Sequence, residues 1–329
     1  MGRIPDCRIR GLESQAVTAF RRKKPTAAPG GIRARRSLYL THVVEPWAYL
    51  TPALMLIALV ILVPLVIGIS YSFQNIMLLR PKEASWAGLS NYAALWSDRK
   101  FWIALENTFV WTFGSLFFQF FLGLGLALLL NTKFPGKRLF QALVFLPWAV
   151  PTFLSALVWA WLFNPLIGPL PHWLAALGVL SEPYNILGDP DLAIWGPIAA
   201  NIWFGVPFFA ITLLAALQSI PSELYEAAEI DGASAWQSFT KITLPFLAPM
   251  IAITVMLRTI WIANFADLIF IMTGGGPANS SQILSTYIFT TAFKKLDFGY
   301  ASALSVALLL ILFLYAVLVM VLRRKLVKI

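Results

Sequence analysis

The side chains best placed to do chemistry lie between Pro221 and Pro249, the most charged segment between the two ends of an otherwise apolar chain. A membrane-embedded enzyme such as a glycosyltransferase needs acids or histidines clustered at one membrane face, and this segment is the only candidate for such a cluster. Two long apolar runs flank it, so it must lie outside the hydrocarbon, because charged side chains are costly there. Its four acidic residues are Glu223, Glu226, Glu229 and Asp231.

The first half of this segment is predicted to form a short amphipathic helix. Ser222 is a suitable N-cap, and the acids of the first turn lie where the helix dipole favours negative charge. Leu224, Ala227 and Ala228 share one face at the i, i+3, i+4 spacing. Gly232 can adopt the left-handed conformation that ends a helix.

A second short helix is expected from about Ser234 until Pro245 stops it, because proline removes a backbone donor. Its apolar positions are Trp236, Phe239 and Ile242. The segment is therefore expected to be a pair of helices that are joined at a glycine and held at the membrane surface.

This pattern resembles the EAA loop of permease subunits of binding-protein-dependent ABC importers. The matching residues are Glu226-Ala227-Ala228, Asp231-Gly232-Ala233, Phe239, Ile242, Leu244-Pro245 and Pro249. The resemblance runs from about Trp47 to the end, through Asn107-Thr108, Pro147, Pro151 and Thr273-Gly274-Gly275-Gly276-Pro277. The last motif and its surroundings look like the carbohydrate branch, typified by maltose-type and glycerol-phosphate-type permeases.

The resemblance implies an all-α membrane protein with the type I permease fold, in the bacterial cytoplasmic (inner) membrane. It implies a transport subunit and no enzyme, with a carbohydrate substrate such as an oligosaccharide or a sugar derivative. The implied partners are a second, homologous permease in a heterodimer, an ABC ATPase dimer and an extracytoplasmic solute-binding protein. No cofactor is expected in this chain, because the partner ATPase would bind ATP and Mg.

Coupling to the ATPase is implied for one set of positions, with Glu226 as the polar contact at the ATPase groove and Gly232 as the turn. The full set is Glu226, Ala227, Ala228, Asp231, Gly232, Leu244 and Pro245.

Composition excludes a soluble protein, since 59% of the residues are hydrophobic, 12% are charged and the mean hydropathy is +0.75. One cysteine and two histidines make a disulfide framework impossible and a haem redox core or a His-rich metal site unexpected. No G-x-x-x-x-G-K-[ST] phosphate cradle occurs, because Gly136-Lys137 is followed by Arg138. The chain is therefore not expected to hydrolyse ATP itself.

The net charge of +10 does not indicate a nucleic-acid partner, because the basic residues gather at one side of the predicted membrane. Ten Lys and Arg precede residue 41, three lie in 131–138, and four follow Leu322. This is the positive-inside pattern, which predicts that both termini are cytoplasmic.

Six membrane spans are predicted from the apolar runs, at about 47–73, 101–130, 139–163, 192–217, 246–272 and 299–322. In the second span, Gly123 lies where another helix could approach closely. Residues 1–40 are expected to be a basic cytoplasmic tail without fixed structure. Residues 41–329 would then form the transmembrane permease domain, with the cytoplasmic coupling loop at 218–245. These spans are expected to be embedded in the lipid bilayer.

Polar side chains inside the predicted spans are candidates for a substrate path, because such groups usually face a cavity or a partner at membrane depth. On a continuous fifth span, Asn264 and Asp267 share a face with Trp261. Amide or acid groups beside an aromatic ring suit a sugar, which needs hydrogen bonds and a stacking surface. The candidate residues are Asn201, Arg258, Trp261, Asn264 and Asp267.

Three alternatives stay open. An ion-coupled secondary carrier would need intramembrane acids and usually shows inverted repeats, of which none is apparent. An ABC permease for an anionic substrate, such as glycerol phosphate or an acidic oligosaccharide, is compatible with Arg258. For Arg258 itself, the sequence favours pairing with another subunit over contact with substrate.

Overall fold

The computed structural model describes residues 45–326, so the predicted basic tail at 1–40 lies outside the described residues. The chain divides into two parts, 1–65 and 66–329, which are described separately. The described portion of the first part is helical, with α2 at Glu45–Ile57 and a π-helical turn η2 at Ala58–Leu62. These elements lead into α3 at Val63–Ser72, which confirms the predicted first span.

The wide turn η2 lies directly before Pro64, where the Val63 N–H bonds to the Ala58 carbonyl instead of to the usual i−4 partner. This shift accommodates the proline, which has no N–H of its own and crowds the preceding turn.

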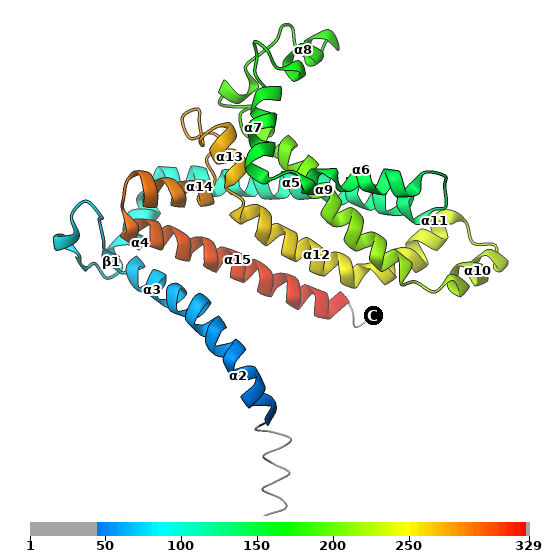
Figure 1. The fold of residues 1–329 in the computed structure, drawn as a ribbon, viewed down its shortest axis with the longest axis horizontal. Coiled ribbons are helices and arrows are strands. Elements are labelled where there is room, and N and C mark those ends of the chain that lie inside the picture. The colour runs from blue at the N-terminus through cyan, green and yellow to red at the C-terminus, as the bar shows by residue number, and fades with distance from the viewer. Residues whose placement is uncertain (1–44, 327–329) are drawn as a thin grey trace, which may run out of the picture. The chain divides into compact units, whose positions relative to one another are not determined.

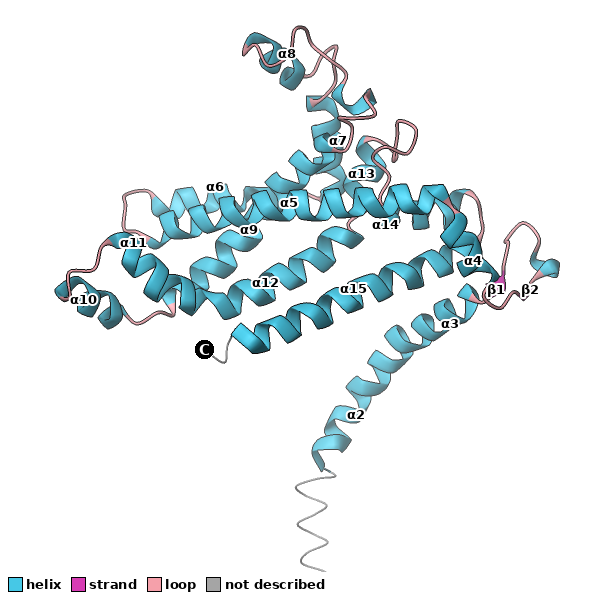
Figure 2. Ribbon diagram, turned by 180° about the vertical axis from the view of Figure 1, so that it is seen from behind, coloured by secondary structure: helices cyan, strands magenta, loops and turns pink. Residues whose placement is uncertain are grey.

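Residues 66–326 are mostly helical (Figures 1 and 2). A two-stranded antiparallel hairpin follows α3, with β1 at Gln74–Asn75, the 3₁₀ turn η3 at Pro81–Glu83 and β2 at Ser85–Trp86. The helices up to the acidic segment are α4 at Ser90–Ser97, α5 at Arg99–Asn131, α6 at Lys137–Ala149, α7 at Thr152–Leu162, α8 at Pro169–Ala176 and α9 at Trp195–Gln218, with the 3₁₀ turn η4 at Ile186–Gly188. The rest are α10 at Ser222–Ile230, α11 at Ala235–Ser238, η5 at Phe239–Thr243, α12 at Leu244–Asn264, α13 at Asp267–Met272, α14 at Leu284–Phe289, η6 at Thr290–Lys294 and α15 at Phe298–Leu326.

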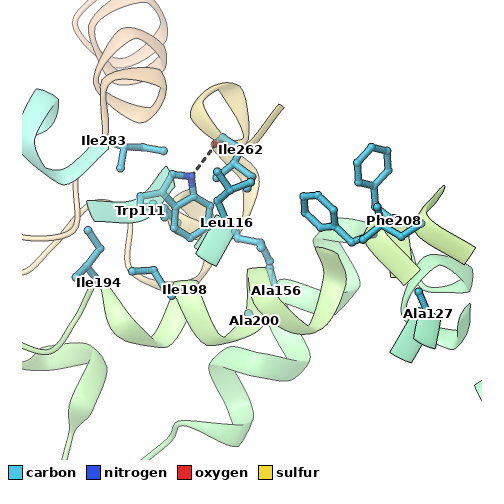
Figure 3. Close-up of a cluster of buried hydrophobic side chains, with 14 of the residues drawn as sticks. Trp111, Leu116, Ala127, Ala156, Ile194, Ile198, Ala200, Phe208, Ile262 and Ile283 are labelled. Atoms are coloured by element: carbon cyan, nitrogen blue, oxygen red, sulfur yellow. Dashed lines mark hydrogen bonds between the residues drawn. The ribbon is translucent and has the colours of Figure 1, made fainter. Parts of the chain in front are cut away.

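The packing of this part is built around α5 and α9, which lie side by side along most of their length (Figure 1). Gly123 makes this possible, since a Cβ there would collide with the Cβ of Phe209 and lie 3.1 Å from the Val206 carbonyl oxygen. The predicted close approach at Gly123 is thus confirmed. In Figure 3, the buried Trp111 of α5 bridges to α12, where its indole N–H donates to the Ile262 carbonyl at 2.8 Å.

Five helical stretches within residues 45–326 are long and apolar enough to cross a membrane, and the α6–α7 pair makes a sixth if it is counted as one span. The predicted span at 139–163 is not one continuous helix, because α6 and α7 meet at 95°. Pro151 causes the break, since a residue before proline avoids the helical conformation and Val150 is extended (φ −96°, ψ 126°). The bend brings α7 against α13.

The predicted fifth span at 246–272 lies within the candidate span Ala235–Met272, but the helix inside it differs from the prediction in two places. It begins earlier, because Pro245 does not stop the preceding helix: the π turn η5 accommodates it, with the Leu244 N–H bonded to the Phe239 carbonyl. It ends at Asn264, because Phe265 leaves the helical conformation (φ −87°, ψ 82°) before α13 begins at Asp267.

Helix α14 was not predicted, because its residues were assigned to the loop after the glycine-rich motif. Two neighbouring residues of α5 hold this loop in place. The Asn107 amide donates to the carbonyls of Asn279 and Gln282, at 3.2 and 3.0 Å. The Thr108 hydroxyl accepts from the Leu284 N–H at 2.9 Å. These hydrogen bonds join residues more than 170 positions apart, so no local sequence pattern could predict them. The Asn107-Thr108 pair was identified in the sequence only as part of the family resemblance.

A carboxylate fastens the beginning of α5 to the last two helices. Asp98 accepts hydrogen bonds from the hydroxyls of Tyr287 and Tyr300, at 2.6 and 2.8 Å, and from the Lys100 N–H at 2.9 Å. Burial alone would raise the pKa of Asp98, but these hydrogen bonds and the charge of Lys295 lower it below its usual value of 3.8. The carboxylate therefore stays ionised and ties α5 to α14 and α15.

Asp98→Asn is expected to destabilise the fold at neutral pH by about 1–3 kcal/mol, because the amide replaces a charged acceptor of two hydroxyls. Because the pKa of Asp98 is lower in the folded than in the unfolded protein, ionised Asp98 stabilises the fold at pH values above 3.8. This stabilisation is lost as the pH falls through the pKa of the folded state. The gap in Tm between wild type and variant, measured in detergent, should therefore shrink from about pH 5 to about pH 3. An equal gap at both pH values would contradict this role.

Candidate functional site

Helix α10 ends at a left-handed glycine, as predicted. Gly232 has φ +77°, and no atom lies within 4 Å of the position of an added Cβ. The Ala233 N–H bonds to the Ala228 carbonyl and the Gly232 N–H to the Glu229 carbonyl, at 2.8 and 3.0 Å. This pair of bonds is a Schellman motif, which satisfies the last carbonyls of the helix. The turn therefore depends on backbone conformation and not on side-chain packing.

The two helix starts differ from each other. Ser234 caps α11 in a capping box with Gln237, so the predicted start there is confirmed. The predicted N-cap at Ser222 is wrong, because Ser222 is the first helical residue and Pro221 occupies the cap without a side-chain hydrogen bond. Proline already holds an extended conformation there, which starts the helix without a polar cap.

The side of α10 that carries the EAA residues is open to solvent. Glu226 and Ala227 are exposed, and Ala228 is partly exposed. Two large apolar side chains in the same segment are also uncovered, with Ile230 at 87% and Trp236 at 71% exposure. These two side chains extend the uncovered surface of the α10–α11 pair.

Tyr225 connects α10 to the rest of the molecule. Its hydroxyl shares a hydrogen bond with the Thr243 hydroxyl at 2.8 Å, and its ring packs against the main hydrophobic core. The predicted apolar face consists of Leu224, Ala227 and Ala228, of which Leu224 and Ala227 are exposed, and the contact of Tyr225 with the core was not predicted. Its position directly before the Glu226-Ala227-Ala228 motif was the available signal.

A cavity of about 550 Å³ opens beside α12, and half of its lining residues are aromatic. The Trp148 indole N–H donates to the Phe204 carbonyl at 3.0 Å, and the rings of Phe204 and Phe265 stack with centroids 5.7 Å apart. Arg258 and Asn264 are its polar side chains. The lining residues are Trp148, Phe204, Arg258, Ile260, Trp261, Ile262, Asn264 and Phe265.

Behind this cavity, one polar side chain from each of α5 and α12 meets α9. The Arg258 Nε–H donates to Gln119 Oε1 at 2.8 Å, and the Gln119 amide donates to the Asn201 carbonyl at 2.8 Å. Gly205 leaves the room for this contact, since a Cβ there would collide with both Gln119 and Arg258. Gln119 is completely buried and was not among the predicted site residues.

The structure brings together three of the five predicted path residues. Arg258, Trp261 and Asn264 line the same cavity. Asn201 is fully buried behind it and does not line it. The predicted shared face of Asn264 and Asp267 is wrong, because the helix breaks at Phe265 and Asp267 lies exposed at the start of α13.

These features define a class: a helical membrane protein with a polar and aromatic cavity among its spans and an exposed helix pair at one end. Residues 119–328 match the family described as the binding-protein-dependent transport system inner membrane component. The match covers more than half of the chain, so the chain belongs to this family.

Relatives with assigned transport systems support the same family. The trehalose/maltose transport system permease protein MalF of Thermococcus litoralis is 40% identical, over 68% of this chain and 75% of that protein. The sulfoquinovosyl glycerol transport system permease protein SmoG of Agrobacterium fabrum is 36% identical, over 79% and 83%. Among solved structures, a bacterial ABC transporter that imports the acidic polysaccharide alginate matches with a TM-score of 0.75, at 25% identity, over 88% of this chain and 99% of that chain.

Proposed function

We propose that this chain is a permease subunit of an ATP-driven ABC importer and forms part of the translocation path for a carbohydrate. The relatives named for trehalose/maltose and sulfoquinovosyl glycerol, and the fold neighbour named for alginate, support a sugar or oligosaccharide. Aromatic ring faces beside Asn264 and Arg258 suit such a substrate, because sugars offer hydroxyls for hydrogen bonds and an apolar ring face for stacking.

One observation carries the proposal: the exposed helix pair is continuous with the helix that lines the cavity. Helix α11 passes through η5 into α12 without interruption, and Tyr225 fastens α10 to that junction through Thr243. A displacement imposed on α10 therefore reaches Arg258, Trp261 and Asn264 as a rigid-body motion. In this proposal Glu226 contacts the ATPase groove and Gly232 forms the turn between the two surface helices.

The remaining coupling residues have structural positions that fit this role. Ala227 and Ala228 have small side chains, so they add little bulk to the docking side of α10. Asp231 is the C-cap residue of α10. Leu244 and Pro245 begin α12, directly after the π turn. ATP and Mg would be bound by the partner ATPase, and this chain would contribute neither a cofactor site nor catalysis.

The proposed orientation places the α10–α11 pair in the cytoplasm. The α5–α6 connection and the end of α15 lie at the same end of this part of the molecule as α10 and α11 (Figure 1). Basic residues gather in these segments, at Lys133, Lys137, Arg138, Lys241 and Arg323. By the positive-inside rule this end faces the cytoplasm, which fits six spans with both termini inside if α6–α7 counts as one span.

Partner chains complete the proposed transporter. One chain presents one coupling helix pair, whereas ABC ATPases work as dimers with two grooves, so a second permease is needed. We propose a heterodimer of related permeases with an ATPase dimer beneath and an extracytoplasmic solute-binding protein that delivers the sugar. The solved complex of the alginate transporter with its periplasmic protein supports the last partner.

An ion-coupled secondary carrier is less well supported. Such carriers use acids buried at membrane depth. Within the described candidate spans the acidic residues are Glu106 and Asp267, and both are exposed.

The proposed function is tested on the complex purified from its native membrane and reconstituted with its binding protein. Native mass measurement should find one copy of this chain, one related permease and two ATPase subunits. Sugar uptake should stop when the phosphate-binding lysine of the ATPase is replaced. Uptake that continues without ATP hydrolysis would overturn the importer, and two copies of this chain without a second permease would overturn the heterodimer alone.

Glu226→Lys is expected to weaken association with the ATPase at least tenfold, because a charge-assisted hydrogen bond contributes about 1.5–3 kcal/mol. Folding should be unaffected, since the side chain is exposed. Co-purification of the ATPase measures the effect. Glu182→Lys is the matched control, since it makes the same charge change at an exposed position outside the helix pair. Equal ATPase yield from both variants would contradict docking at Glu226.

A further inference from the structure

We propose that the cavity beside α12 accepts an acidic carbohydrate and that the Arg258 guanidinium binds its carboxylate or another anionic group. This inference rests on the proposed function, because it names the class of sugar that the path accepts. It makes Arg258 a specificity-determining residue for the substrate.

Arg258 is a buried cation without a counter-ion in the described chain. Its exposure is 5%, in the membrane-spanning α12. Among the side chains that the structure describes, the one ion pair joins Arg80 and Glu83, so none of the described carboxylates neutralises Arg258. A buried charge that lacks a partner is strongly destabilising, so its counter-charge must come from outside these residues.

The Arg258 guanidinium has a fixed orientation, but most of its N–H donors have no hydrogen-bond acceptor. Its Nε–H donates to Gln119, and the Phe208 ring lies under it with 5.8 Å between Cζ and the ring centroid. Its Nη2 is buried without a hydrogen-bond partner. Arginine has five N–H donors, and Gln119 accounts for one of them. Nη2 lies against α9 at Gly205, whereas Nη1 makes no hydrogen bond and is not fully buried, so the Nη1 N–H groups are the donors that an anion in the cavity can reach.

Gln119 keeps this side chain from rotating away. Its Oε1 accepts from Arg258 while its amide donates to the Asn201 carbonyl on α9, so the Gln119 carboxamide has only one orientation. The arginine is therefore held in place before any ligand arrives, which lowers the entropy cost of binding.

The other walls favour a sugar as the source of the anion over an acid of the second permease. Trp148 and Trp261 line the same cavity and offer ring faces, and Asn264 offers an amide. The volume of about 550 Å³ falls within the range of about 300–1,000 Å³ typical of small-molecule sites. A guanidinium beside aromatic rings in one cavity suits a uronic acid unit, which offers a carboxylate and an apolar ring face.

The test is uptake by the full reconstituted importer of two matched probes, trigalacturonate and its neutral methyl ester, together with maltotriose as a neutral sugar of another kind. We expect trigalacturonate to be imported. Arg258→Gln should lower its uptake about 10- to 100-fold and lower the uptake of neutral probes less, because only the acid loses a charge-assisted hydrogen bond.

Gln119→Glu provides an independent variant that keeps the arginine. The new carboxylate would neutralise Arg258 from within the chain, so acidic uptake should fall in the same way. Import of neutral sugars alone by the wild type would overturn the inference and leave the proposed function standing. Equal loss of acidic and neutral uptake in Arg258→Gln, or unchanged acidic uptake in Gln119→Glu, would also overturn it. Import of no carbohydrate would overturn the proposed function itself.

Discussion

Gly123→Val is expected to disrupt the packing of α5 against α9 and to lower the stability of the protein by about 3 kcal/mol or more. A Cβ at this position would collide with Phe209 and press against the α9 backbone at Val206 and Ala210. Backbone atoms cannot move aside as a flexible side chain can, so the two helices would have to separate. The yield of monodisperse protein and the Tm in detergent should both fall.

Gly125 supplies the control two residues further along the same helix. No atom lies within 4 Å of an added Cβ there, so Gly125→Ala should be neutral or stabilising by about 0.5–1 kcal/mol through higher helix propensity. The comparison separates a loss of helix–helix contact from a general effect of glycine replacement. Similar Tm values for Gly123→Val and Gly125→Ala would show that α5 and α9 do not pack closely in the membrane.

Gly232→Val is expected to uncouple the importer while leaving the membrane part folded. The space around Gly232 is open, so the cost comes from its φ of +77°, which a β-branched residue does not tolerate. The left-handed conformation costs a residue with a side chain about 1–2 kcal/mol. The conformation in which α10 and α11 are joined by this turn therefore becomes roughly 5- to 30-fold less populated. Substrate-stimulated ATP hydrolysis by the assembled complex should fall accordingly.

Asparagine is the matched replacement, because it adopts the left-handed conformation more readily than other residues with a side chain. Gly232→Asn should therefore keep most of the stimulated ATP hydrolysis that Gly232→Val loses. Full stimulation in Gly232→Val would refute the role of this turn in coupling. An equal loss in both variants would show that the side chain itself, and not the backbone conformation, is the obstacle.

Much of the helical organisation was determined by local features of the sequence. Apolar runs of sufficient length specify spans, because every backbone polar group in hydrocarbon must be satisfied within a helix. Gly232 and Ser234 specify the turn and the second helix start through conformational preference and capping, which act within a few residues. Gly123 indicated a close approach but not its partner.

Only the tertiary structure decided how prolines act in each helix. At Val150-Pro151 the helix is interrupted and the two halves meet at 95°. At Pro245 the helix continues, because the π turn η5 just before it accommodates the proline. Each proline lacks a backbone N–H and so leaves one carbonyl without its usual partner. The sequence does not show whether a wide turn in the same helix or packing against another helix will make up for the lost hydrogen bond. At Pro151 the bend is matched by the packing of α7 on α13.

The cavity was likewise decided in three dimensions. Arg258 and Asn264 were visible in the sequence as polar residues in an apolar run, but Gln119 is 139 positions away from Arg258 and gave no sign of contacting it. Asp267 was grouped with Asn264 by helical spacing, and the break at Phe265 separates them. Local patterns specify which groups enter the membrane, and long-range packing specifies which of them meet.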